Sequence, residues 1–130
     1  MDLNQVTVPC TDYGASVRFY KTLGLRQIVD SPPHYARFET EAGTTLSIHA
    51  TESGSPGSGV TVYFEVDNVD LTIRMLTERG LEFETAPKDQ DWLWREAYLS
   101  DPAGNQICIY HAGDNRRNPP WRIEEDSASG

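Results

Sequence analysis

Three short segments of the chain carry hydrogen-bonding or reactive side chains at every second position. If each segment is a strand, these side chains share one face of a sheet, because successive strand residues point to opposite faces. Hydroxyl, amide, thiol, imidazole and carboxylate groups gathered on one face can bind an organic ligand, hold a metal ion or transfer a proton. The three sets are Thr45, Ser47 and His49; Thr61, Tyr63 and Glu65; and Gln106, Cys108 and Tyr110.

Glu65 is the one candidate acid or base that these patterns place firmly on a face, and His49 is the second candidate catalytic residue. Burial can raise the pKa of a carboxyl group toward neutral pH, so either residue can serve a metal-independent acid/base enzyme. Together with Gln5, the two residues also define a displaced metal site. His49 lies near the end of its predicted strand, before a polar linker, where a solvent-exposed histidine is the commoner outcome.

The two cysteines, Cys10 and Cys108, are expected to be free thiols, because a reducing compartment disfavours disulfides. A nucleophilic Cys108 would need a nearby base or cation to lower its pKa, and its strand offers neither a His nor a Lys within reach. We therefore expect Cys108 to fill space in the wall of a pocket.

The segment DWLWREAY (91–98) supplies aromatic side chains. As a strand it would place Trp92, Trp94 and Glu96 on one face. A tryptophan there can stack on a planar ligand or pack into the core or a subunit interface, and packing is the favoured interpretation.

The elements that carry these residues belong to an internal repeat. Shifted by 56 positions, QVTVPCTDYGASVRFYKTLGL (5–25) aligns with TVYFEVDNVDLTIRMLTERGL (61–81). Each copy opens with a strand pattern and continues with apolar residues at helical spacing. Asp12 and Asn68 are suited to cap the two helices, and a glycine follows each helix.

A second pair of segments, 35–50 and 95–111, aligns at an offset of 61, because the second copy carries a longer insertion. Both have the pattern of hairpins, with turns at 41–43 and 101–104. The repeated unit is therefore β-α-β-β-β, which predicts an α+β fold. We expect a single domain over 1–123, divided into a first repeat (3–50), a Gly/Ser linker (51–59), a second repeat (60–112) and a C-terminal segment (113–123), with a disordered tail over 124–130.

This tandem unit resembles the vicinal oxygen chelate superfamily, which includes glyoxalase I, extradiol dioxygenases, fosfomycin-resistance transferases and bleomycin-resistance binding proteins. The resemblance covers roughly residues 3–112, and SDPAGNQICIY (100–110) and DYGASVRFYKTLGL (12–25) are its most specific parts. It implies curved mixed sheets that form a cup, completed in a homodimer. In such a dimer, Trp121 and the arginines around it (Arg116, Arg117 and Arg122) are expected to clasp the partner subunit, or one arginine to enter the cup and pair with an anionic substrate.

Metal-dependent members of that superfamily hold one divalent ion on the first and last strands of each unit, through His, Gln or Glu. The resemblance places these four positions on Gln5, Ser47, Thr61 and Cys108. The set contains no carboxylate and no imidazole, and neutral hydroxyl groups are weak ligands. We therefore expect no metal cofactor at these positions, and a divalent metal only at the displaced site.

Charge limits the partners of the chain. Eleven Lys and Arg residues against 20 Asp and Glu residues give a net charge of −9, which repels nucleic acid and anionic membranes. The chain has neither the apolar run of a membrane span nor the pattern of a signal peptide, so we expect a cytoplasmic protein.

The expected function is the binding of a small organic molecule in a cup that lacks the usual metal ligands. Two alternatives stay open: a metal-dependent lyase, isomerase or dioxygenase that uses the displaced site, and the metal-independent acid/base enzyme. The expected ligand-binding residues are Gln5, Ser47, His49, Thr61, Tyr63, Trp92, Trp94, Cys108 and Tyr110.

Overall fold

The computed structural model describes residues 1–52 and 59–125, so the middle of the predicted linker and the end of the predicted tail lie outside the described residues. The first unit consists of β1 (Gln5–Cys10), α1 (Tyr13–Leu23), β2 (Arg26–Ser31), β3 (Tyr35–Glu39) and β4 (Thr45–Ala50). The second consists of β5 (Thr61–Glu65), α2 (Val69–Glu78), β6 (Lys88–Asp89), β7 (Arg95–Ser100) and β8 (Gln106–His111), followed by the 3-10 helix η1 (Gly113–Arg116).

The two units form equivalent four-stranded mixed sheets, ordered β1-β4-β3-β2 and β5-β8-β7-β6. In the first sheet β1 runs parallel to β4, and Gln5 is the register partner of Thr45. In the second sheet β5 runs parallel to β8, and Thr61 is the register partner of Gln106. The sequence repeat is therefore also a repeat of strand register, and the predicted α+β fold of two β-α-β-β-β units is confirmed.

The helices begin where the capping residues predict. The side chain of Asp12 accepts a hydrogen bond from the backbone N–H of Ala15, and that of Asn68 accepts one from Leu71, each at 3.0 Å. Gly24 ends α1 in the left-handed conformation, with φ of 116°. Each cap satisfies a backbone N–H that the first helical turn leaves without a partner, so the polar residues before each apolar run fix where the helix starts.

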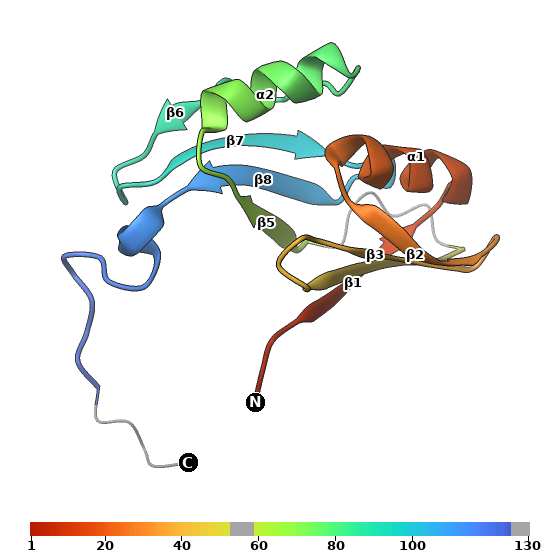
Figure 1. Cartoon of the computed structure of the whole chain (residues 1–130), viewed down its shortest axis with the longest axis horizontal. Coiled ribbons are helices and arrows are strands. Elements are labelled where there is room, and N and C mark those ends of the chain that lie inside the picture. The colour runs from red at the N-terminus through yellow and green to blue at the C-terminus, as the bar shows by residue number, and fades with distance from the viewer. Residues whose placement is uncertain (53–58, 126–130) are drawn as a thin grey trace.

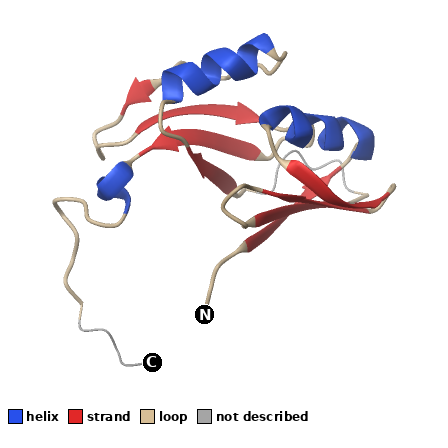
Figure 2. Ribbon diagram, in the orientation of Figure 1, coloured by secondary structure: helices blue, strands red, loops and turns tan. Residues whose placement is uncertain are grey.

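Both helices cover the same side of the molecule, and the sheets lie beneath them (Figures 1 and 2). The helix-facing sides of the two sheets contribute to one core, in which Phe38 and Ile48 of the first unit join Ile107 and Ile109 of the second. Tyr20 on α1 lies in this core, and its hydroxyl donates a hydrogen bond of 2.6 Å to Asp101 in the β7–β8 turn. We call the opposite side of each sheet, which faces away from the helices, its open face.

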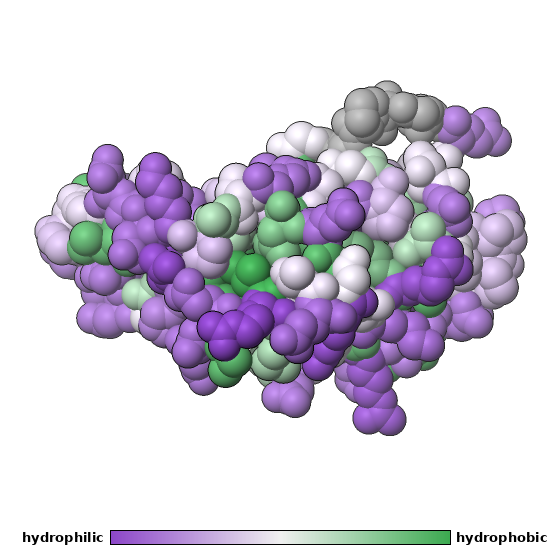
Figure 3. Space-filling view, turned by 90° about the horizontal axis from the view of Figure 1, so that it is seen from above, coloured by the Kyte–Doolittle hydropathy of each residue, from purple (hydrophilic) through white to green (hydrophobic). Residues whose placement is uncertain are grey.

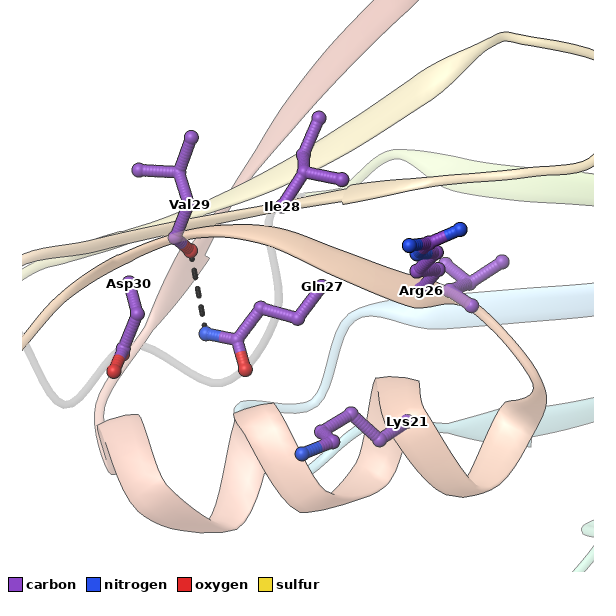
Figure 4. Close-up of a pocket in the computed structure, with 7 residues that line it drawn as sticks. Lys21, Arg26, Gln27, Ile28, Val29 and Asp30 are labelled. Carbon is purple, nitrogen blue, oxygen red and sulfur yellow. Dashed lines mark hydrogen bonds between the residues drawn. The ribbon is translucent and has the colours of Figure 1, made fainter.

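A bulge interrupts strand β2, where the register with β3 shifts between Gln27 and Val29. Figure 4 shows the result: Ile28 and Val29 both point away from α1, whereas Gln27 and Asp30 point toward it. The Gln27 side chain donates a hydrogen bond to the Val29 carbonyl at 3.2 Å, within the bulge. The hollow between α1 and β2 is lined by Lys21 from the helix and by both polar and apolar residues of the segment 25–30.

Seen from the helix side, the surface is mostly hydrophilic, with apolar atoms exposed along its middle (Figure 3). Neither helix is long and apolar enough to cross a membrane in the part of the chain that the structure describes.

One strand is shorter than its sequence pattern predicts. β7 begins at Arg95, and Leu93 has a positive φ of 69° in the turn before it. The predicted alternation over 91–98 is therefore wrong for Trp92, which lies in this turn and is 45% exposed. Trp94 and Glu96 keep the predicted face, because Trp94 stacks on Tyr110 and Tyr110 is the register partner of Glu96.

Candidate functional site

The open face of the second sheet carries a cluster of three aromatic rings. Trp94 stacks on Tyr110, with ring centroids 4.6 Å apart and planes 19° apart. Tyr63 meets both rings edge-on, at 6.0 Å from Trp94 and 5.7 Å from Tyr110. Tyr63 is 50% exposed, so the cluster presents an aromatic surface to solvent. Rings in this arrangement offer π faces on which a planar or cationic group can stack.

A buried carboxylate lies beside these rings. Glu96 on β7 is 2% exposed, and it accepts hydrogen bonds from the Tyr98 hydroxyl at 3.0 Å and from the Cys108 thiol at 3.5 Å. Register explains the contacts, because Tyr98 pairs with Cys108 and Glu96 pairs with Tyr110 across β7 and β8. A carboxylate in such a place favours a positively charged or hydrogen-bond-donating ligand.

Cys108 is held as a neutral thiol by this environment. Burial and then the negative charge of Glu96 raise its pKa to about 12, from an ordinary value of 9.0. Because the thiolate is the form that attacks electrophiles and binds metals, Cys108 is neither a nucleophile nor a good ligand near neutral pH. Cys10 is also a free, buried thiol, in the core between the units.

Glu65, a candidate catalytic residue, is engaged in holding the chain after β8. One of its carboxylate oxygens accepts backbone N–H groups from Ala112 at 2.8 Å and Gly113 at 2.9 Å, and Arg116 and His111 lie 3.8 Å from the carboxylate. Burial raises the pKa of Glu65, but these hydrogen bonds and positive partners outweigh it, and the net shift is downward. A carboxylate held ionised at the start of η1 is an anchor rather than a base tuned to neutral pH.

The open face of the first sheet is built from different chemistry. Thr7, Ser47 and Arg37 form one row across β1, β4 and β3, because Thr7 pairs with Ser47 and Ser47 with Arg37. The hydroxyls of Thr7 and Ser47 are 2.6 Å apart. Next to this row, the Arg37 Nε donates to the Tyr35 hydroxyl at 2.9 Å, and the guanidinium lies 5.4 Å from the centre of the Tyr35 ring. His49, the register partner of Tyr35, is exposed.

The four positions that the resemblance assigns to metal ligands do not fit a divalent ion. The Gln5 carbonyl oxygen accepts a hydrogen bond from Thr45, and the Thr61 hydroxyl donates to Gln106, both at 2.9 Å. The Ser47 hydroxyl forms a hydrogen bond with the Thr7 hydroxyl, and the raised pKa of Cys108 keeps its thiol protonated. Nothing in this donor set brings the negative charge that a divalent cation needs. Across the described ranges, His, Cys, Asp and Glu side chains nowhere gather in threes around a point that a metal ion could occupy.

The predicted ligand-binding residues therefore do not gather in one site. Tyr63, Trp94, Cys108 and Tyr110 come together on the second open face. Ser47 is fully buried beneath its neighbours on the first, and His49 lies exposed at the end of the same strand. Gln5 and Tyr63 both line a largely apolar groove of about 360 Å³ between β1 and β5, whereas Thr61 is tied to Gln106 and Trp92 lies in a turn.

Sequence reasoning missed several residues on these faces. The candidate catalytic residues are Glu65 and His49, whereas Glu96, predicted only to share a face with Trp94, is the carboxylate buried on the second open face. Sequence reasoning also left out Tyr35, Arg37 and Thr7. The alternation in YARFE was a usable signal, since buried Ala36 and Phe38 leave Tyr35 and Arg37 on the other face.

Comparison with known proteins identifies the family to which this architecture belongs. Residues 2–109 match the model of the Glyoxalase/Bleomycin resistance protein/Dioxygenase superfamily. The uncharacterized protein YraH of Bacillus subtilis (strain 168) is 31% identical over 126 residues, which covers 85% of this chain and 98% of YraH.

Two solved structures show the same fold. A glyoxalase/bleomycin resistance protein/dioxygenase from Nocardioides has a TM-score of 0.78 and 24% identity, and the match covers 95% of this chain and 90% of that one. A bleomycin-binding protein complexed with bleomycin has a TM-score of 0.72 and 21% identity, with 85% of this chain and 98% of that one covered. The repeated units, their register and these matches together show that the chain belongs to the glyoxalase/bleomycin resistance protein/dioxygenase superfamily.

Proposed function

We propose that this protein binds a small organic molecule on the open face of its second sheet and releases it chemically unchanged. The observation that carries the proposal is the aromatic cluster of Tyr63, Trp94 and Tyr110, in which Tyr63 is half exposed, beside the buried carboxylate of Glu96. Aromatic faces next to a negative charge suit a ligand with a planar or aromatic part and a positive charge. The net charge of −9 favours the same class of ligand.

A binding role fits the side chains better than a catalytic one. The thiol of Cys108 is kept protonated, and Glu65 is tied to the backbone of the segment after β8. The bleomycin complex of a structural relative with the same fold supports a cup that holds an organic ligand. Because that relative is only 21% identical, bleomycin serves here as a probe and not as an assigned ligand.

We further propose that a second copy of the chain completes the cup, as expected from the sequence. Within the aromatic cluster, Tyr63 is half exposed although Tyr110 is buried. The segment after η1 leaves Trp121 56% and Ile123 76% exposed, and it leads away from the sheets (Figure 1). A partner subunit would cover both groups of apolar side chains.

Calorimetric titration with bleomycin and with benzylammonium, a small aromatic cation, tests the proposal. We expect saturable binding, with each ligand recovered intact by mass spectrometry. Tyr63→Ala should weaken binding about tenfold or more, the usual cost of removing a central aromatic contact. Leu71→Ala, which removes an apolar side chain of similar exposure on α2, should leave binding unchanged.

Three results would contradict the proposal. Failure of both ligands to bind would remove it, and so would equal affinity of the wild type and Tyr63→Ala. Turnover that depends on added metal would favour the metal-dependent alternative instead. Sedimentation of the same samples gives the mass of the protein. If the protein is a monomer under the conditions in which calorimetry shows saturable binding, a cup completed by a second subunit is ruled out.

A further inference from the structure

A row of hydroxyl groups crosses the open face of the first sheet next to Arg37. Arg37 donates through Nε to the Tyr35 hydroxyl oxygen at 2.9 Å, and the neighbouring Ser47 hydroxyl lowers the pKa of Tyr35. The hydroxyls of Ser47 and Thr7 are 2.6 Å apart, and either can be the donor. Ser47 therefore links Thr7 to Tyr35 across the sheet.

The Tyr35 hydroxyl is a donor that a ligand can use. Its oxygen accepts the hydrogen bond from Arg37 Nε, so its proton can be directed away from the guanidinium. Ser47 is fully buried, whereas Tyr35 is partly buried and Thr7 is exposed, so both ends of the row reach the surface.

Arg37 adds an uncompensated positive charge beside that proton. The ion pairs formed by arginines in the described part of the chain use Arg26, Arg95, Arg116 and Arg122, and leave Arg37 without an acid. Glu39 is two residues away on the same strand, but it pairs with Arg26. Arg37 is half-buried, its Nε is fixed by Tyr35, and its two terminal nitrogens are left to donate elsewhere.

We propose that Tyr35 and Arg37 form a binding subsite for the oxyanion of an organic ligand, a carboxylate or a phosphate. The two terminal nitrogens of Arg37 match the two oxygens of such a group, and the Tyr35 O–H supplies a further donor. Neither residue belongs to the aromatic cluster, so the subsite stands whether or not that cluster binds a cation.

A titration with matched small aromatic probes tests the subsite. Benzoate, benzamide and phenyl phosphate share a ring and differ in charge, and their binding can be followed by NMR shifts of the Arg37 Nε–H. We expect benzoate or phenyl phosphate to bind at least about tenfold more tightly than neutral benzamide, a difference typical of charge-assisted hydrogen bonds. The tighter of the two anions identifies the group that the subsite prefers.

Variants then separate the subsite from general electrostatics. Arg37→Gln should reduce the affinity for the anion to that for benzamide, and Tyr35→Phe, which keeps the ring, should weaken it severalfold. The control Arg26→Gln removes an equal charge from β2, where that arginine is paired with Glu39, and should leave the affinity unchanged.

The phenol provides a readout independent of affinity. A bound anion disfavours the phenolate, so benzoate should raise the pKa of Tyr35, as followed by the NMR signal of its ring carbon bearing oxygen. Equal affinity for benzoate and benzamide, an unchanged affinity in Arg37→Gln, or an equal loss in Arg26→Gln would overturn the proposal.

Discussion

The two β-α-β-β-β units share a backbone plan and differ in what their side chains do. Their helices have equivalent caps, and their sheets have the same parallel register. The first unit has a polar open face, with linked hydroxyls and a guanidinium, whereas the second has stacked aromatic rings beside a carboxylate. A duplicated scaffold therefore constrains register and core packing, and leaves the open faces free to take opposite chemistry.

The equivalent hairpin turns differ in the same way. In both turns, residues at the repeat offset make the same backbone bonds, Gly43 N–H to Thr40 and Gly104 N–H to Asp101. The side chain of Asp101 is buried and accepts hydrogen bonds from Tyr20, Ala103 and Asn105. The side chain of Thr40 only meets Thr44 at the surface. One turn thus holds the two units together, and the other closes a hairpin.

The largest effect should come from breaking the β7–β8 turn, which holds the two units together. Asp101→Ala leaves several buried donors without an acceptor, so we expect the free energy of unfolding to fall by about 3 kcal/mol or more. The matched change Thr40→Ala should cost about 0.5 kcal/mol or less, because its partner remains solvated. Urea unfolding followed by tryptophan fluorescence measures both. Similar losses in the two variants would show that the turns are energetically equivalent.

The two cysteines, one in each unit, should respond differently to the loss of the charge on Glu96. Removing the charge in Glu96→Gln should lower the pKa of Cys108, but not to its ordinary value, because burial is the larger cause of the shift. One pKa unit would raise the thiolate fraction of Cys108 about tenfold at a fixed pH. Alkylation rates resolved by mass spectrometry report this change.

Cys10 is the internal control for that experiment. Its pKa is raised by burial and then by Asp101 and Asp12, and Glu96 is not among the causes. The ratio of the Cys108 rate to the Cys10 rate therefore cancels any change in global opening. If the ratio does not change in Glu96→Gln, the carboxylate exerts no field on the thiol.

Much of the fold was readable from local signals. Asp12 and Asn68 marked the helix starts, and Gly43 and Gly104, both with positive φ, marked the hairpin turns. These signals act within a few residues, so one sequence carries them completely. The predicted strand alternation was wrong at Trp92, because no residue in DWLWREAY indicates that Leu93 adopts a positive φ.

The open faces were harder to predict, because their chemistry depends on register between distant strands. Tyr98 meets Cys108, and Arg37 meets Ser47, only once the hairpins are aligned. Alternation correctly placed Tyr63, Cys108 and Tyr110 on one face. It could not show that Glu96 is buried while Glu65 is tied to the backbone, because that difference depends on the path of the chain after β8.

The smallest effect should come from Glu65, which has no equivalent anchor in the first unit, where its repeat position is Pro9. Glu65→Gln weakens the hydrogen bonds to Ala112 and Gly113 and the attraction to Arg116, so we expect a loss of about 1 kcal/mol near neutral pH, discounted for solvent exposure. The folded-state pKa of Glu65 lies below its ordinary value of 4.5. Its contribution is therefore complete above that ordinary value and disappears as the pH falls through the lowered one. Urea unfolding at a series of pH values should show the stability difference between wild type and Glu65→Gln closing in acid. A difference that stays constant with pH would mean that the charge of Glu65 contributes nothing and that only its shape matters.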